Sequence, residues 1–429
     1  MADEWQTHSL GDLTDNHDGK RKPVKETDRR PGPYPYYGAS GIVDYVDDYL
    51  IDGDYLLIAE DGENLRTRQT PIAFMARGKS WVNNHAHIVT GNEKADTRFL
   101  MYALQGTDIS GYLTGAVMPK LTQGNLNKIQ IECPEIEEQR TIAHILGTLD
   151  DKIELNRRMN ETLEAIARAM FKSWFVDFDP VRAKMNNEPP ESICRRLGLT
   201  PDLLALFPDR LTDSELGEIP EGWSITPLPE VIDFLEGPGI RNWQYTEAED
   251  GIKFINIRCI KDGDLTLDTA SKITAEEAFG KYKHFQLAED DIVVSISGTL
   301  GRFGFVRKAH LPLSLNTSVV RFRPISGKST LYFIAGFTEN QLQRELEIRA
   351  SGSAQRNFGP MHLKQIKILL PPHPILQAHA NIVEGLFRKR QGNLNQIDAL
   401  VSIRDVLLPK LLSGELRVPQ DEKLMEATI

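Results

Sequence analysis

The chain has 429 residues and a formal net charge of −11 at pH 7, from 50 Lys plus Arg against 61 Asp plus Glu. Hydrophobic residues make up 40% and charged residues 26%, which is typical of a globular protein and excludes a disordered or fibrous one. The length predicts two or three domains. The acidic total excludes a histone-like polybasic binder, but it leaves room for local basic loops that contact phosphates.

The sequence begins Met-Ala-Asp-Glu-Trp, without a basic segment followed by an apolar one, and no apolar run approaches the roughly 20 residues that cross a bilayer. We therefore expect a cytoplasmic protein. The three cysteines, Cys133, Cys194 and Cys259, are too far apart for a disulfide framework or a CxxC metal site.

Positive charge first gathers in a turn-rich stretch that leads into Tyr34-Pro-Tyr36-Tyr37. Such a loop combines phosphate-binding cations with aromatic rings that can stack or anchor. The DNA-binding candidates of this stretch are Lys20, Arg21, Lys22 and Tyr36. A solvated turn without a ligand is the alternative interpretation.

The first part of the chain then predicts a mixed fold. Tyr55–Ala59 and Ile88–Val89 are short β-rich runs, and 97–104 has the pattern of a helix packed on them. His85-Ala-His87 puts two imidazoles on one strand face, where a structural role, a nucleic-acid contact and a metal site all remain open. The segment that follows, Met118 to Asn125, supplies four further DNA-binding candidates, Lys120, Thr122, Gln123 and Asn125.

Pro134 precedes a long helix with apolar residues in alternating steps of three and four, which predicts a heptad seam with a polar centre. The seam residues are Ile142, Leu146, Leu149, Ile153, Asn156, Asn160, Leu163, Ala167, Met170 and Trp174. Asp179-Pro180 ends this helix, and 186–190 reads as a linker. A short helix near 202–207 and turns at Pro208, Pro220 and Gly222 lead to a second domain.

The second domain again combines strands, at Ile292–Ile296 and Val319–Phe322, with a helix over Leu331–Arg349. Arg, Asn and Gln are the side chains that reach base edges with two hydrogen bonds. The DNA-binding candidates here are Arg241, Asn242, Ser297, Thr299, Arg302, Gln355, Arg356 and Asn357.

An internal repeat joins the two parts. A shift of 237 positions brings Tyr55 onto Ile292, Gly115 onto Gly352 and Pro134 onto Pro371. The register continues into a second long helix after Pro371-Pro372, whose seam is His379, Val383, Leu386, Arg390, Asn393, Ile397, Leu400, Arg404, Leu407 and Leu411. Asn393 falls onto Asn156, and a polar seam residue of this kind fixes register and partner. Each helix of about 38 residues would extend about 57 Å.

Familiar catalytic patterns are missing from the sequence. It contains neither a GxxxxGK[ST] phosphate loop nor the Asn/Asp-Pro-Pro-Tyr/Phe motif of amino-methyltransferases. Gly298, Gly301 and Gly304 have the spacing of a turn and not that of a dinucleotide loop. Asp18-Gly-Lys20 lacks the strand context of a metal-dependent nuclease. We predict no catalytic residue and no metal ligand.

An ordered set of segments resembles the specificity subunit of type I restriction-modification systems. The segments are 126–134, Glu138-Gln-Arg-Thr-Ile-Ala143, 149–156, 169–178, Leu216-Gly-Glu-Ile-Pro-Glu-Gly-Trp223 and 408–416. The resemblance extends over nearly the whole chain. Pro374-Ile-Leu-Gln377 in the second helix departs from the Glu-Gln-Arg of the first.

The resemblance implies an α+β fold with two target recognition domains on mixed or antiparallel sheets, separated by two long antiparallel helices. The expected parts are recognition domain 1 at 1–134, helical spacer and linker at 135–200, recognition domain 2 at 201–371, and a second helical spacer and tail at 372–429. The residues expected at the spacer and partner interface are Leu146, Leu149, Ile153, Asn156, Leu163, Trp174, Leu386, Asn393, Leu400, Leu407 and Leu411.

The resemblance also implies a noncatalytic subunit that reads a bipartite, asymmetric sequence in double-stranded DNA. Its partners would be two methyltransferase subunits that use S-adenosylmethionine and restriction subunits that use ATP and Mg, so this chain would bind no cofactor. Two heads on a rod can contact major-groove sites about 34 Å, one helical turn, apart. A self-contained DNA-modifying enzyme and a coiled-coil adaptor for proteins alone are the alternatives.

Overall fold

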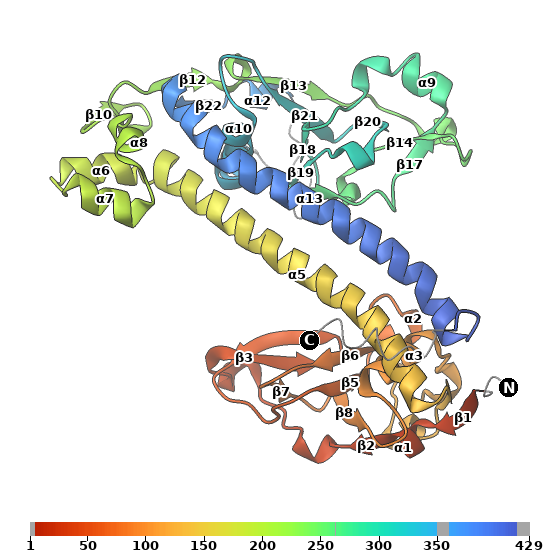
Figure 1. Ribbon diagram of the computed structural model, residues 1–429. Coiled ribbons are helices and arrows are strands. Elements are labelled where there is room, and N and C mark those ends of the chain that lie inside the picture. Colours follow the sequence, from red (N-terminus) through yellow and green to blue (C-terminus); the bar gives the residue numbers. More distant parts are fainter. Residues whose placement is uncertain (1–4, 262, 350–359, 418–429) are drawn as a thin grey trace. The chain divides into compact units, whose positions relative to one another are not determined.

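The structure is a computed structural model that describes residues 5–261, 263–349 and 360–417. Contacts within the chain divide it into two compact units (Figure 1). Unit 1 comprises Met1–Leu155 and Gln396–Ile429, and unit 2 comprises Asn156–Asn395. Two 40-residue helices, α5 (Ile136–Phe175) and α13 (His373–Leu412), contribute to both units. None of the described helices has the length and apolar character needed to cross a membrane.

The core of unit 1 is an antiparallel four-stranded sheet with the order β2-β8-β5-β6. Its strands are β2 (Thr14–Asn16), β8 (Ala86–Gly91), β5 (Tyr55–Ala59) and β6 (Ala73–Ala76). Leu56, Leu57 and Ile58 of β5 are fully buried, because both faces of the sheet are covered. Helix α3 (Thr97–Gly106) packs on one face and begins at Asp96, whose carboxylate accepts from the amides of the first helical turn.

Two smaller sheets complete unit 1. The first has the order β4-β3-β7, with β3 and β7 parallel, and the second pairs β1 with β9. The strands are β3 (Pro31–Gly38), β4 (Gly41–Val46), β7 (Trp81–Val82), β1 (Gln6–Ser9) and β9 (Gln130–Cys133). We call the part of each unit that holds the sheets its head. The pair β1 and β9 joins the two ends of the head of unit 1 before the chain enters α5.

Unit 2 repeats this topology sheet by sheet. Its four-stranded sheet has the order β13-β21-β18-β19, its three-stranded sheet the order β17-β14-β20 with β14 and β20 parallel, and β12 pairs with β22. The strands are β12 (Ser224–Pro227), β13 (Ile232–Glu236), β14 (Ile252–Phe254), β17 (Ser271–Ile273), β18 (Ile292–Ser295), β19 (Phe303–Phe305), β20 (Leu313–Ser314), β21 (Val319–Pro324) and β22 (Lys367–Leu370). Strands β5 and β18 hold equivalent places, as the 237-residue shift predicts.

The predicted helices are also confirmed. The helix predicted over Leu331–Arg349 is α10 (Leu331–Phe337), one π-helical turn (Thr338–Leu342) and α11 (Gln343–Arg349). The predicted linker joins α6 (Asp179–Met185) to α7 (Pro190–Leu197), and α8 (Pro201–Ala205) precedes the hairpin of β10 (Leu211–Ser214) and β11 (Gly217–Pro220). Aromatic residues of α5, among them Phe171 and Trp174, pack with this segment and with the head of unit 2 in one core.

In unit 2, α5 and α13 lie side by side and antiparallel (Figure 1). Asn160 contacts Asn393, Glu164 pairs with Arg390, and the Phe171 ring lies 6.2 Å from His379, so the numbers rise on one helix and fall on the other. Seven seam residues are buried: Asn156, Asn160, Trp174, His379, Val383, Arg390 and Asn393. The half-buried ones are Leu163, Ala167, Met170 and Leu386.

The other halves of the two helices meet in unit 1. Arg404 of α13 pairs with Asp150 of α5 at 3.0 Å, and Arg417 pairs with Glu138 at 2.9 Å. Ile142, Leu146, Ile153 and Leu411 are buried, and Leu149, Ile397, Leu400, Arg404 and Leu407 are half-buried. Leu411 belongs to the same core as Leu10 and Phe99 of the head. The expected domain limits at 134, 200 and 371 stay a prediction, since the contact division cuts through both helices.

Candidate nucleic-acid interface

Eight of the thirteen DNA-binding candidates that the structure describes lie at one edge of the four-stranded sheet in each unit, where the strands end or begin. In unit 1, β2 and β5 end at this edge and β8 begins there, so it carries the segments 17–22, 60–61 and 83–85. In unit 2, β13 and β18 end at the equivalent edge and β21 begins there, so it carries 237–244, 296–302 and 316–318. The repeated topology therefore puts two different sets of loops at equivalent places.

Glu60 connects two of the predicted clusters in unit 1. The Arg21 guanidinium pairs with this carboxylate, and Lys120 Nζ lies 3.1 Å from Glu60 Oε1. Burial raises the pKa of Glu60, but the hydrogen bonds from Arg21 and Lys120 outweigh it and hold the pKa below its usual range. Residues 20–22 and the loop before Leu121 thus form one surface, which we call the Glu60 cluster: Arg21, Glu60 and Lys120.

His87 supports the same edge from inside. The ring is 1% exposed, with Nδ1 2.6 Å from Asp18 Oδ2 and Nε2 2.8 Å from the carbonyl oxygen of Leu121. Contacts at both ring nitrogens hold the imidazole in one orientation. Burial raises the pKa of Asp18, but the hydrogen bonds from His87 and the Ile88 amide lower it below its usual value. His87 therefore has a structural role.

His85, by contrast, is exposed, and its Nδ1 lies 2.8 Å from Asp61. No group of three His, Cys, Asp or Glu suited to a metal ion occurs in the part of the chain that the structure describes.

The aromatic candidate of the first loop lies in the interior. Tyr36 is 1% exposed, its hydroxyl accepts from the Val24 amide at 3.0 Å, and the Arg29 guanidinium lies 4.5 Å from the ring centroid. Tyr36 therefore supports the loop and does not offer its ring to a ligand. Lys20 and Lys22 are exposed, with their ammonium groups 5.2 Å from the Tyr55 ring and 5.9 Å from the Trp81 ring.

The three remaining candidates of unit 1 are Thr122, which precedes the short helix α4 (Gln123–Leu126), and Gln123 and Asn125 within it. The Thr122 hydroxyl caps this helix by accepting from the Asn125 amide, and Asn125 Nδ2 donates to the Tyr112 carbonyl at 2.8 Å. The Gln123 side chain is exposed. Gln123 is thus the one of the three whose side chain is presented to solvent, while Thr122 and Asn125 order the loop.

In unit 2, Arg241 and Asn242 are exposed at the start of a short 3₁₀ turn (Asn242–Gln244). Gln244 anchors that turn, because its amide donates to the Tyr282 hydroxyl at 2.9 Å and to Glu277 at 2.8 Å. The anchored turn leaves Trp243 79% exposed. A large aromatic ring held in solvent next to an arginine can stack on a base.

The segment from Ser297 to Arg302 is the predicted turn, and it connects β18 to β19. Ser295 Oγ donates to the Thr299 carbonyl at 2.5 Å and accepts from the Arg302 amide at 3.0 Å. Gly298 and Gly301 have φ of 67° and 76°, which non-glycine residues rarely adopt. Thr299 and Arg302 are exposed and Ser297 is half-buried. Arg302 forms no ion pair with any residue that the structure describes.

Gln355, Arg356 and Asn357 lie outside the described residues. Sequence reasoning missed Glu60, Asp18 and Asn316, because it searched for exposed side chains that could contact DNA. These three residues instead hold the loops in place. Asn316 Oδ1 accepts from the Ile240 amide at 3.1 Å and holds the 237–244 loop against β21. Their positions in the sequence could have indicated a role in the loops. Glu60 directly follows the buried strand β5, and Asn316 precedes β21 by three residues.

The arrangement suits recognition. Lysine, arginine, glutamine and asparagine side chains, with one exposed tryptophan, are held on loops that rigid strands carry. The described candidates in the two units differ in kind: Lys20, Lys22, Lys120 and Gln123 are presented in unit 1, and Arg241, Asn242, Thr299 and Arg302 in unit 2.

Comparisons with known proteins agree with this duplicated architecture. The family described as "Type I restriction modification DNA specificity domain" matches residues 2–165 and 220–399. The MjaIX specificity subunit of a type I restriction enzyme from Methanocaldococcus jannaschii is 26% identical, over 97% of this chain and 94% of that protein. The HindI specificity subunit from Haemophilus influenzae is 30% identical, over 70% of this chain and 71% of that protein.

A solved structure has the same fold. The crystal structure of the type I restriction-modification S subunit from M. genitalium superposes with a TM-score of 0.61 at 16% identity, covering 95% of this chain and 96% of that one. The family match extends over both repeats and covers most of the chain. This protein belongs to the family of type I restriction-modification specificity subunits.

Proposed function

We propose that this chain is the noncatalytic subunit that gives a type I restriction-modification complex its DNA sequence specificity. Each unit would read one part of a bipartite site in double-stranded DNA through the loops at the edge of its four-stranded sheet. The observation that carries this proposal is the repeat of that edge with different side chains, since topologically equivalent loops that carry different donors suit two different sequences.

The difference between the loops supports an asymmetric site. Unit 1 presents Lys120 beside Glu60, and Lys20 and Lys22 beside aromatic rings. Unit 2 presents Arg241 and Arg302, and an arginine fork can donate two hydrogen bonds to one guanine. We expect unit 2 to contribute more base reading and unit 1 more phosphate positioning.

We also infer that this chain assembles with two methyltransferase subunits and with restriction subunits. Those partners would supply S-adenosylmethionine, ATP and Mg. Ile166 on α5 is 46% exposed and Ile403 on α13 is 48% exposed, and the shift of 237 positions brings one onto the other. Two exposed apolar residues at equivalent places are suited to two copies of one partner.

The test is the methylation pattern made by the complex of this chain with its methyltransferase subunits. We expect methylated adenines within one bipartite, asymmetric motif, read by sequencing DNA from cells that make the complex. Methyl transfer by the isolated chain would contradict the proposal and favour a self-contained enzyme. Equal retention of all duplexes by the complex, measured over a range of salt concentrations, would favour a protein-only adaptor.

A domain exchange makes the test specific to one half-site. Strands β12 and β22 are paired in register from Ser224↔Leu370 to Pro227↔Lys367, and the Leu228 amide donates to the Ile366 carbonyl at 2.9 Å. A segment from 228 to 366 therefore begins and ends at adjacent residues and can be replaced while both strands stay. We expect one half of the motif to change and the other to be retained. A change in both halves would contradict independent reading.

A further inference from the structure

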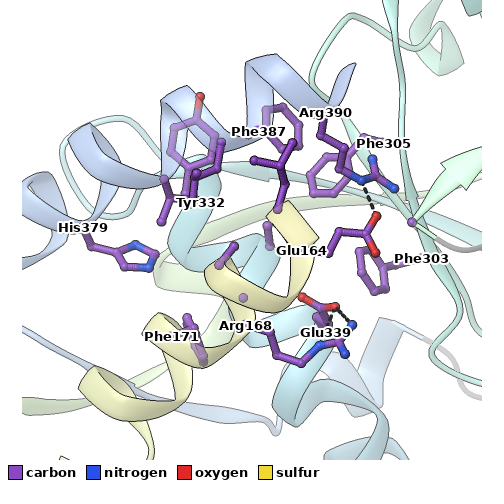
Figure 2. Close-up of a pocket in the computed structure, with 17 residues that line it drawn as sticks. Glu164, Arg168, Phe171, Phe303, Phe305, Tyr332, Glu339, His379, Phe387 and Arg390 are labelled. Carbon is purple, nitrogen blue, oxygen red and sulfur yellow. Dashed lines mark hydrogen bonds and ion pairs between the residues drawn. The ribbon is translucent and has the colours of Figure 1, made fainter. Parts of the chain in front are cut away.

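Unit 2 contains a cavity of about 340 Å³ where both long helices meet the head (Figure 2). Its lining comes from α5, α13, α10, the π-helical turn that follows α10, β19 and Gly263. A volume of this size lies in the range of small-molecule sites, and sites of this kind occur where helices or domains join. None of the DNA-binding candidates that the structure describes lines this cavity.

Aromatic side chains make up much of the wall. Figure 2 shows Phe171 from α5, Phe303 and Phe305 from β19, Tyr332 from α10 and Phe387 from α13 around the space. Flat aromatic rings bind well between such walls, by stacking or by edge-to-face contact. The wall therefore favours a planar, apolar ring system over a flexible chain.

Each charge in the wall is paired within the wall. Glu164 pairs with Arg390, and Arg168 Nη2 lies 2.5 Å from Glu339 Oε1. Among the residues that the structure describes, the lining contains no other Asp, Glu, Lys or Arg. A charged ligand would lose its hydration without gaining a free counter-charge, so the cavity suits a neutral ligand.

One polar side chain in the lining has no partner. His379 is 1% exposed, and neither Nδ1 nor Nε2 has a hydrogen-bond partner among the described residues. Burial lowers the pKa of His379 to about 3, so the neutral ring offers one donor and one acceptor. Edge-on contacts with Trp174 at 5.8 Å and Phe175 at 4.9 Å hold the ring in place. Buried polar groups in folded proteins nearly always have partners.

We propose that this cavity binds a small, neutral heteroaromatic molecule of one or two fused rings that forms a hydrogen bond with a ring nitrogen of His379. The ring of the ligand lies between the aromatic walls. Because the lining comes from both helices and the head, occupancy stabilises the junction that these elements form in unit 2.

Three bicyclic probes of similar size test the proposal on the full-length chain: benzimidazole, which has one donor and one acceptor, indole, which has a donor only, and indene, which has neither. Affinities are measured by ligand-observed NMR, and the ¹⁵N shifts of the His379 ring report where the probe binds. We expect benzimidazole to bind about tenfold more tightly than indene, with indole between them. Absence of saturable binding, or equal affinity for all three probes, would overturn the proposal.

Three variants locate the site. His379→Phe keeps an aromatic ring and should remove the preference for benzimidazole over indene, while His373→Phe, at an exposed position of the same helix, should keep it. Ala335→Leu should weaken all three probes, because it fills the space from α10. If Ala335→Leu does not fold, the comparison of the two histidine variants decides alone. Unchanged binding to His379→Phe would place the probe elsewhere and overturn the assignment.

Discussion

Asn393 Nδ2 donates a hydrogen bond of 2.9 Å to Asn160 Oδ1 inside the seam between α5 and α13. Both residues are buried. The repeat does not require this bond, since the shift of 237 positions brings Asn156 onto Asn393 but Ile397 onto Asn160. A buried amide pair in such a seam costs stability and specifies one register of the two helices.

Removal of one amide should therefore cost more than removal of both. Asn160→Leu leaves the buried Asn393 amide without its acceptor, and we expect a loss of about 1–3 kcal/mol in the free energy of unfolding. Asn160→Leu with Asn393→Leu should recover much of that loss. Urea unfolding of the two single variants and the double variant measures the coupling. Ala165→Leu, at an exposed position of α5, is the control, and additive losses in the double variant would show that the amides do not act as a pair.

Two helical glycines should respond in opposite directions to alanine. A Cβ at Gly336 of α10 would lie 2.1 Å from Cδ2 of Phe171, a buried ring, so Gly336→Ala should destabilise the protein by about 1–3 kcal/mol. Gly385 of α13 has no atom within 4 Å of that position, and Gly385→Ala should stabilise by up to about 1 kcal/mol through helix propensity. Thermal unfolding checks both, and a shift of the same sign in the two variants would contradict the packing of α10 on α5.

Asp18 should make unit 1 sensitive to acid. Although burial raises its pKa, the hydrogen bonds from His87 and Ile88 hold it below the usual 3.8. A carboxyl with a depressed pKa stabilises the fold above its unfolded pKa, and that contribution is lost as the pH falls through the lower folded value. We expect the urea midpoint to fall below about pH 4. Asp18→Asn should lower the free energy of unfolding at pH 7 by about 2 kcal/mol and make the urea midpoint less dependent on pH below about pH 4. Asp28→Asn, at an exposed position, should have neither effect.

Ile166 and Ile403 give a test of the inferred partners. Ile166→Glu and Ile403→Glu should each remove one of two methyltransferase subunits, because a carboxylate would be buried without a partner in an apolar contact. Native mass spectrometry reads the stoichiometry. Both side chains are about half exposed, so the fold should tolerate the change. Thr162→Glu on the exposed face of α5 is the control, and full assembly of both isoleucine variants would place the partners elsewhere.

Arg302 offers a distinction between base reading and phosphate positioning. A guanidinium that donates twice to one guanine cannot be replaced by an ammonium, so Arg302→Lys and Arg302→Ala should both weaken binding of the complex by about tenfold or more and relax the second half-site. Binding to duplexes with single base changes measures this. Recovery by Arg302→Lys with unchanged sequence preference would instead assign Arg302 to a phosphate.

The sequence predicted the repeated parts of the fold well. Strands Tyr55–Ala59 and Ile292–Ser295 are short apolar runs buried on both faces, and the seams of α5 and α13 follow a heptad spacing. These features depend on local patterns that recur at a fixed shift. The three-stranded sheets were not predicted, because β7 and β20 are two-residue strands whose pairing is parallel and distant in sequence.

The candidate site was harder to predict, because its charges are paired over long sequence distances. Arg21 and Lys120 both pair with the carboxylate of Glu60. A search of the sequence for basic clusters does not reveal these pairs. Tyr36 belongs to an aromatic run that suggested a stacking surface. It lies in β3, which pairs antiparallel with β4, and its side chain is buried in the core. The turn that carries Arg302 was predicted correctly, since Gly298, Gly301 and Gly304 mark it locally.

Leu411 is 1% exposed in the core that it shares with Leu10 and Phe99. Leu411 is synthesised more than three hundred positions after both residues, so the core of the first head is still incomplete when the head leaves the ribosome. Closing so long a loop is slow compared with local pairing, and an open apolar surface invites aggregation in the meantime. We expect truncation before α13 to leave the first head insoluble, and a permuted chain that begins with α13 to fold during its own synthesis.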